Sequence, residues 1–290
     1  MAVVCAGELL FDCWPDGRRR PGGAPANLAA HAAALGAESV LLSRVGDDAA
    51  GRQLARWLTA ARVGCVIGPA DPDRPTGRVD VTAAPDGRPV YDIVTPAAWD
   101  FLEAAEAARQ AAGRAKVFVY GTLAQRHPVG RRAIRSLAEA ARSGRARVMA
   151  DLNLRAPFYD DEILLWTLRH CEILKLNREE LAEVSRLMGA AGPEAHLFTG
   201  LLREFGIARG VLTAGGDGAW IFDEGALTHE PAVPGTEVVD PVGAGDAFCA
   251  ALAVGLAAGR SLRESAPRAA RAAAMVVSRH GATPLLSPGI

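Results

Sequence analysis

From about residue 115 onward, the sequence alternates short β-rich runs with longer helical patterns. Each run follows a segment that has the pattern of an amphipathic or alanine-rich helix. Strands connected through helices pair in parallel, and the helices then cover the faces of the sheet. The sequence therefore predicts an α/β fold with a central parallel sheet, whose strands include residues 116–120, 147–150, 172–176 and 210–214.

The first third of the chain departs from this alternation. After a strand and a helix within residues 37–60, segment 76–94 alternates apolar and polar residues on either side of a turn at Pro85-Asp86-Gly87. This pattern predicts a β-hairpin. The hairpin is either an edge of the main sheet or a flap over a ligand site at the ends of the parallel strands. We expect a single domain over residues 1–290, with a small β lid from about 10–20 and 76–95.

Composition narrows the class of protein. Half of the 290 residues are apolar, 22% are charged and the formal net charge is −1, which is typical of a soluble globular enzyme and offers no basic excess for nucleic acid. The five cysteines are scattered without metal-ligand spacing, as in a reduced cytoplasmic protein. The N-terminus lacks the basic region of a signal peptide, and no apolar stretch is long enough for a membrane span. We therefore expect a cytoplasmic protein with no membrane partner.

The segment DPVGAGDAFCAALAVGLAAG, residues 240–259, carries the strongest chemical indication. Gly243, Ala244 and Gly245 begin an apolar helix, and their free N–H groups and the helix dipole form a ready anion site. Asp246 in the same turn either stabilises the helix start or accepts a proton from an alcohol during phosphoryl transfer. The chain contains no Walker A loop, and no GxGxxG follows its first strand, so a bound phosphate must be held by a different structural element.

GAGD preceded by Asp240 resembles the C-terminal signature of the ribokinase-like, or PfkB, family of carbohydrate kinases. PGGAPANLAAHAAALG (21–36) and RVGDDAAGRQLARWL (44–58) resemble its N-terminal signature, so the resemblance extends over essentially the whole chain. It implies a three-layer sandwich with a central, mostly parallel sheet and a β lid. It also implies ATP-dependent transfer of a γ-phosphoryl group to a sugar hydroxyl, with Asp246 as the base beside Gly243, Ala244 and Gly245.

Further motifs extend the resemblance to ligand contacts. NREE (177–180) matches an NxxE motif that orients Mg²⁺ and phosphate, and TAGGDG (213–218) matches a nucleotide loop. Taken alone, the first pattern also fits a helix cap and the second a turn. DLNLR (151–155) resembles a DxNxR element of the fructokinase and ketodeoxygluconate kinase branches that faces the phosphates or the sugar. GELLFD, which ends at Asp12, resembles a sugar-side element. The resemblance assigns Lys175, Asn177, Thr213, Gly215 and Gly218 to ATP, Glu180 to Mg²⁺, and Asp12, Gly22, Gly23, Asn27, Asn153 and Arg155 to the sugar.

One position departs from the family pattern. Pro241 stands where the signature usually has threonine, which removes a hydroxyl and an N–H beside the anion site. That change concerns the contacts of this loop to phosphate and its binding of K⁺. Many family members bind K⁺ through carbonyls of this loop and of the C-terminal segment, here 278–283.

The resemblance is strongest to the fructokinase-like branch, which favours D-fructose phosphorylated at O6. 2-Keto-3-deoxygluconate or another small sugar is the alternative within the class, and a non-catalytic sugar or nucleotide sensor is the alternative outside it. A lid with exposed strand edges further predicts a homodimer formed through the lid.

Overall fold

The structure, a computed structural model, describes residues 2–68, 70–84 and 89–290. Within them the main sheet has nine strands, and the seven from β11 to β5 in sheet order are parallel. Strands β12 and β13 continue one edge as an antiparallel hairpin, which the alternating pattern does not reveal. In sheet order the strands are β13 (Ala226–Glu230), β12 (Ala219–Asp223), β11 (Arg209–Thr213), β10 (Ile173–Asn177), β9 (Arg147–Asp151), β8 (Val117–Tyr120), β1 (Ala2–Ala6), β4 (Glu38–Ser43) and β5 (Gly64–Ile67).

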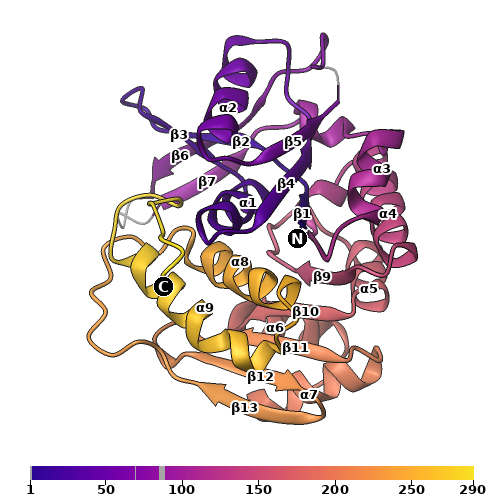
Figure 1. Cartoon of the computed structure of the whole chain (residues 1–290), viewed down its shortest axis with the longest axis vertical. Helices are drawn as coiled ribbons and strands as arrows, with labels where there is room; N and C mark the ends of the chain where they lie inside the picture. The colour runs from indigo at the N-terminus through magenta and orange to yellow at the C-terminus, as the bar shows by residue number, and fades with distance from the viewer. Residues whose placement is uncertain (1, 69, 85–88) are drawn as a thin grey trace.

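Helices cover both faces of this sheet (Figure 1). On one face lie α1 (Ala24–Ala34), α2 (Ala49–Ala60), α8 (Ala244–Ala257) and α9 (Leu262–Val277). On the other lie α3 (Glu106–Gly113), α4 (Pro128–Ser143), α5 (Asp161–His170), α6 (Arg178–Leu187) and α7 (Glu194–Glu204). Short 3-10 turns occur at Ala98–Phe101, Leu123–Gln125 and Gly215–Asp217. The predicted three-layer α/β architecture is confirmed.

The central strands are apolar because both of their faces are buried. In β8, Val117 and Val119 face the core beneath α8, whereas Phe118 and Tyr120 face the core beneath α4. Helix α8 is itself almost wholly buried between α1, α9 and the sheet, which explains its continuous apolar sequence. The carboxyl ends of the parallel strands therefore open onto one edge, beside the N-terminus of α8.

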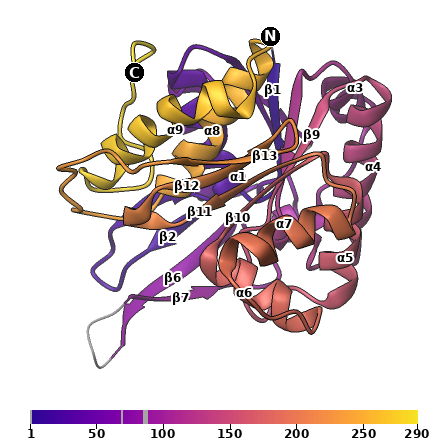
Figure 2. The ribbon, with the colours of Figure 1, turned by 90° about the horizontal axis from the view of Figure 1, so that it is seen from below.

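A second, four-stranded sheet has the order β3 (Arg19–Gly22), β2 (Leu10–Cys13), β6 (Gly77–Ala83) and β7 (Pro89–Ile93). Because β6 pairs with β2, the hairpin of β6 and β7 belongs to this sheet and is no edge of the main one. Figure 2 shows the two strands projecting away from the helical layers. The predicted turn at Pro85-Asp86-Gly87 lies outside the described residues. Within the part of the chain that the structure describes, no helix is both long and apolar enough to cross a bilayer.

Candidate active site

The N-terminus of α8 is the centre of the site. Gly243 caps the helix in a left-handed conformation (φ 85°), and no side chain among the described residues makes a hydrogen bond at this cap. Ala247 is the first residue to donate an intrahelical bond, to the Gly243 carbonyl at 2.9 Å. The N–H groups of Gly245 and Asp246 therefore have no intrahelical acceptor, which makes them candidate donors to an anion.

Gly243 is required both by its backbone angle and by its surroundings. A Cβ atom at this position would lie 2.3 Å from the Ala282 carbonyl oxygen, in the C-terminal segment. Gly259, just past the other end of α8, has the same φ of 85° but open space around its Cα. The two glycines thus separate the cost of the backbone angle from the cost of the close approach.

We predict that Gly243→Ala destabilises the protein more than Gly259→Ala and also lowers its turnover. The left-handed conformation costs each alanine roughly 1–2 kcal/mol, but only residue 243 must also push back the Ala282 backbone. Urea unfolding and ADP release measure the two effects. Equal losses in both variants would show that the approach of residues 243 and 282 is unimportant.

Asp246 is held by α1. The Asn27 amide nitrogen donates to Asp246 Oδ2 at 2.8 Å, which fixes the carboxylate in the first turn of α8. Burial raises the pKa of Asp246 to about 6, against the Asn27 hydrogen bond that lowers it. The Asn27 Oδ1 atom is buried and has no partner among the described residues, so it can still accept a hydrogen bond from a ligand hydroxyl.

A buried ion pair lies beside the same turn. Lys175 and Asp151 are register partners on β10 and β9, and the Lys175 Nζ lies 2.9 Å from Asp151 Oδ1. Burial lowers the pKa of Lys175, but the carboxylates of Asp151 and Glu180 outweigh it and keep the ammonium charged. A Cβ at Gly245 would lie only 3.2 Å from Nζ, so the cation sits next to the anion site and suits its ATP assignment.

Asn177 and Glu180 form a capping box at the start of α6. The Asn177 side chain accepts from Glu180 N, and Glu180 Oε2 accepts from Asn177 N at 2.9 Å. Glu180 Oε1 accepts from Leu154 N at 2.9 Å, so both oxygens are already engaged. The reading of NREE as a helix cap is confirmed, and this geometry does not favour Glu180 as a direct metal ligand.

The loop TAGGDG is the turn between β11 and β12, as its local pattern also predicts. Thr213 is the register partner of Asn177, which brings the two assigned positions together at the sheet edge. Gly215 (φ 57°) is open to solvent. Gly218 (φ 88°) is packed so closely that a Cβ would lie 2.2 Å from the Glu230 carbonyl oxygen.

The sugar-side residues gather where β2 and β3 meet α1. Burial and the neighbouring Asp246 raise the pKa of Asp12 to about 6. A Cβ at Gly22 would lie 2.9 Å from Asp12 Oδ2, and one at Gly23 (φ 102°) would lie 2.5 Å from the Glu8 carbonyl oxygen. Both glycines therefore let the backbone pass close to the acidic cluster formed by Glu8, Asp12 and Asp246.

Asn153 and Arg155 follow β9 on the other side of this cluster. Asn153 adopts a left-handed backbone (φ 45°), which turns the chain toward Arg155. The Arg155 guanidinium is exposed, and its charge lowers the pKa values of Asp12 and Asp246. The charges of Asp12, Asp246 and Arg155 thus lie within electrostatic reach of one another.

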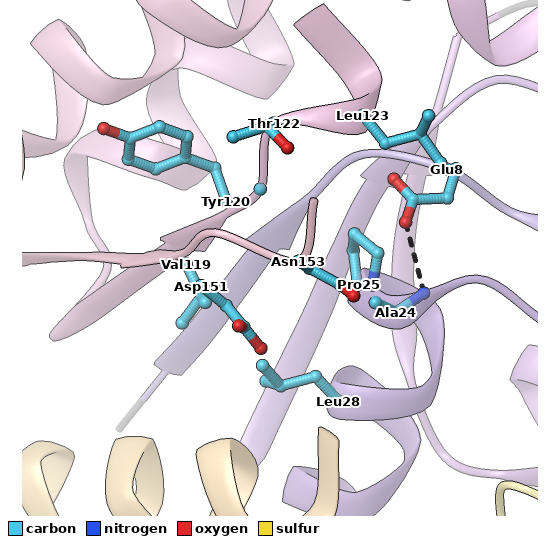
Figure 3. Close-up of a pocket in the computed structure, with 11 residues that line it drawn as sticks. Glu8, Ala24, Pro25, Leu28, Val119, Tyr120, Thr122, Leu123, Asp151 and Asn153 are labelled. Atoms are coloured by element: carbon cyan, nitrogen blue, oxygen red, sulfur yellow. Dashed lines mark hydrogen bonds between the residues drawn. The ribbon is translucent and has the colours of Figure 1, made fainter. Parts of the chain in front are cut away.

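Two residues of this region were not predicted. Glu8 is 4% exposed and accepts from Ala24 N at 3.2 Å; burial raises its pKa to about 7. Figure 3 shows Glu8 with Asp151 and Asn153 around a small cavity of about 20 Å³. A lone acid inside the apolar run AVVCAGELLF is the signal that could have revealed it.

Tyr91 on β7 is the second. Burial raises its pKa, and the carboxylates of Asp12 and Asp240 raise it further, so the phenol lies within electrostatic reach of the site. The register places Tyr91 opposite Val81 on β6, and Asp12 opposite Val79. Opposite residues share a face of a sheet, so Tyr91 and Asp12 lie on the same face of the second sheet.

The loop before α8 is tied to the C-terminal segment. Asp240 accepts from Val242 N at 3.1 Å and from Gly281 N at 2.9 Å, while Pro241 itself is exposed. The Ala282 carbonyl, which faces Gly243, is contacted by His31 Nε2 at 2.9 Å. These bonds hold the loop without the hydroxyl that Pro241 lacks.

The chain is similar to known carbohydrate kinases. The family described as pfkB family carbohydrate kinase matches residues 12–288. The fructokinase of Klebsiella pneumoniae is 32% identical over 266 residues, which cover 87% of this chain and 83% of that protein. Fructokinase-2 of Zea mays is 30% identical over an alignment of 313 residues, which covers 98% and 90%.

A solved structure is also similar to this chain in its fold. The aminoimidazole riboside kinase from Salmonella enterica, complexed with aminoimidazole riboside and an ATP analogue, is 26% identical to this chain. It superposes with a TM-score of 0.84 over 100% of this chain and 98% of its own.

Proposed function

The chain belongs to the pfkB family of carbohydrate kinases, and from this premise we propose that it phosphorylates D-fructose at O6 with ATP, giving fructose 6-phosphate. The observation that carries the proposal is Asp246, held by Asn27 in the first turn of α8, whose N-terminus has no side-chain cap among the described residues. The names of its relatives support fructose as the sugar. 2-Keto-3-deoxygluconate is the alternative substrate, and a non-catalytic sensor is the alternative class.

In the proposed reaction, the sugar O6 attacks the γ-phosphorus while the bond to the β,γ-bridging oxygen breaks, and ADP leaves. Asp246 accepts the proton that O6 loses, and the N–H groups of Gly245 and Asp246 neutralise charge on the transferring phosphoryl group. Lys175 adds a fixed positive charge beside this turn. Asp12 and Asn27 Oδ1 accept hydrogen bonds from the sugar hydroxyls and orient O6.

The described residues support Mg²⁺ as an ion that arrives with the nucleotide. They contain no group of three acidic, histidine or cysteine side chains suited to a metal, and Mg²⁺ commonly relies on substrate phosphates and water. We propose that Glu180 acts on it through water, because both carboxylate oxygens already accept N–H groups. The ion would offset phosphate charge when bound. K⁺ near residues 278–283 stays a prediction.

A substrate panel tests the proposal. Purified protein is supplied with MgATP and fructose, 2-keto-3-deoxygluconate, ribose, glucose or a nucleoside, and ADP release is recorded. Fructose is expected to give the highest kcat/KM. A higher value for another sugar would overturn the fructose assignment but keep the kinase, and ATP binding without turnover on any sugar would support the sensor.

The pKa of Asp246 predicts an acid limb in the rate profile. The base acts only when deprotonated, so kcat/KM is expected to be flat above about pH 7 and to fall at least about tenfold per pH unit below about pH 6. Asp12 titrates in the same range and steepens the fall. Circular dichroism at each pH checks that the protein is folded. A rate unchanged down to pH 5 would contradict Asp246 as the base.

The exposed part of β7 supports the homodimer. Val90 is 47% exposed and lies on the face of β7 opposite to Tyr91, so the projecting strands leave apolar surface away from Asp12 that a second copy can cover. We expect dimers in sedimentation velocity at micromolar concentration. A monomer at that concentration would contradict assembly through the second sheet.

A further inference from the structure

Helix α1 carries two polar side chains, Asn27 and His31, in an otherwise apolar sequence. They are four residues apart, so they lie on the same face of the helix, one turn from each other. Both are buried, at 5% and 1% exposed, although burial of a polar group is unfavourable unless the group forms a hydrogen bond. Helix α1 packs beside α8 (Figure 1), and both side chains form their hydrogen bonds next to the first turn of α8.

His31 is a donor to the C-terminal segment. Its Nε2 lies 2.9 Å from the Ala282 carbonyl oxygen. A carbonyl oxygen only accepts, so Nε2 carries the ring proton and donates it. Burial lowers the pKa of His31 to about 4, against this hydrogen bond, which raises it. The ring is therefore neutral at pH 7 and holds the Ala282 carbonyl without adding a charge.

The Ala282 carbonyl lies against the residue that caps α8. A Cβ at Gly243 would be 2.3 Å from this oxygen and 2.6 Å from the Ala282 Cα. The same segment is attached to the loop before α8, because Gly281 N donates to Asp240 Oδ2 at 2.9 Å. A displacement of Ala282 therefore changes the packing around the backbone at which α8 begins.

The first turn of α8 is thus attached to one face of α1 at two points. Asn27 donates to the Asp246 carboxylate at 2.8 Å. One helical turn further along, His31 holds the carbonyl that lies against Gly243. The base and the start of the candidate anion site are therefore positioned by the same helix face. Their relative position is critical in phosphoryl transfer, because a displacement of about 1 Å can lower a rate roughly a hundredfold.

We propose that His31 is a positioning residue for phosphoryl transfer. By holding Ala282 against Gly243, it keeps the N–H groups of the candidate anion site at a fixed position relative to the base. His31 is 1% exposed, so it acts through Ala282 and not by contact with a substrate. The inference rests on the proposed kinase function. Loss of the His31 donor should therefore lower kcat more than it raises KM for either substrate.

The test compares three replacements of His31 by steady-state ADP release with the best sugar of the panel. His31→Leu removes the donor and should lower kcat about ten- to a hundredfold, with KM values changed less than about threefold. His31→Gln places an amide nitrogen about as far from the backbone as Nε2 and should lose less than about threefold in kcat. His31→Asn is polar but too short to reach Ala282, so it should resemble His31→Leu.

Ser39→Ala is the matched control. The Ser39 hydroxyl is buried and donates to the Ala29 carbonyl of α1 at 2.8 Å, so this variant also loses a buried hydrogen bond of the same helix. Ser39 lies near the amino end of β4, away from the edge where the site lies, and the variant should keep the wild-type kcat. Urea unfolding of every variant verifies the fold. If His31→Leu does not fold, His31→Asn and His31→Gln provide the comparison.

A binding measurement gives a readout that needs no turnover. MgADP with aluminium fluoride and the sugar imitates the transferring phosphoryl group, and calorimetry compares its affinity with that of MgADP alone. The wild type should bind the fluoride complex at least about a hundredfold more tightly. His31→Leu should lose most of this gain, whereas His31→Gln should keep it.

The possible failures are distinguishable. Wild-type kcat in His31→Leu and His31→Asn would overturn the role of His31, and so would an equal loss of kcat in His31→Gln or Ser39→Ala. A wild type with neither turnover nor a gain from aluminium fluoride would instead overturn the kinase function on which the inference rests.

Discussion

Replacing Asp246 with asparagine is expected to lower kcat by about 10²- to 10⁴-fold, because the variant loses the group that accepts the proton of the sugar hydroxyl. Asparagine keeps the side-chain shape and still offers an oxygen to the Asn27 amide, so the start of α8 should retain its geometry. The N–H groups of the anion site also remain. The loss should therefore appear in the chemical step and not in ATP affinity.

Asp12→Asn is the matched comparison for this variant. Asp12 belongs to the same acidic cluster and has a similarly raised pKa, but it is assigned to sugar hydroxyls. We expect a higher KM for the sugar and a much smaller change in kcat than in Asp246→Asn. Steady-state ADP release with varied sugar separates the two. Equal losses of kcat would mean that the cluster has no single base.

Replacing Lys175 with methionine is expected to destabilise the protein by about 3–5 kcal/mol, because it leaves a buried carboxylate without its counter-ion. Lys175 and Asp151 are 6% and 5% exposed, and their charged atoms lie 2.9 Å apart. Urea unfolding followed by circular dichroism measures the loss.

A double variant separates the effect of losing the whole ion pair from the effect of losing only one of its charges. Lys175→Met with Asp151→Leu removes both charges, so much of the lost stability should return even though the anion site loses its cation. Arg178→Met, which breaks exposed ion pairs with Glu194 and Asp217, should leave the midpoint nearly unchanged. If Lys175→Met were as mild as Arg178→Met, the pair would not be buried as described.

Local patterns in the sequence predict much of the fold and of the candidate site. The parallel strands follow from apolar runs that are buried on both faces, and the capping box of Asn177 and Glu180 lies within four consecutive residues. The candidate anion site is equally local, because Gly243 to Asp246 form a single turn at the start of α8. Each of these features is specified by neighbours along the chain.

Features that depend on long-range packing could not be predicted from local sequence patterns. The pairing of Lys175 with Asp151 depends on the register of β10 with β9, 24 residues apart in sequence. Tyr91 reaches the site only because β6 pairs with both β2 and β7.

The most direct test of the central assignment is a single turnover measured by rapid chemical quench. Enzyme in excess over ATP labelled at the γ-phosphate is mixed with saturating fructose, or with the best sugar of the panel, and labelled sugar phosphate is quantified over time. We predict that the wild type transfers the label in one fast phase, whereas Asp246→Asn binds ATP with similar affinity but transfers it at least about a hundredfold more slowly. Transfer by Asp246→Asn at the wild-type rate would contradict the role of Asp246 as the base.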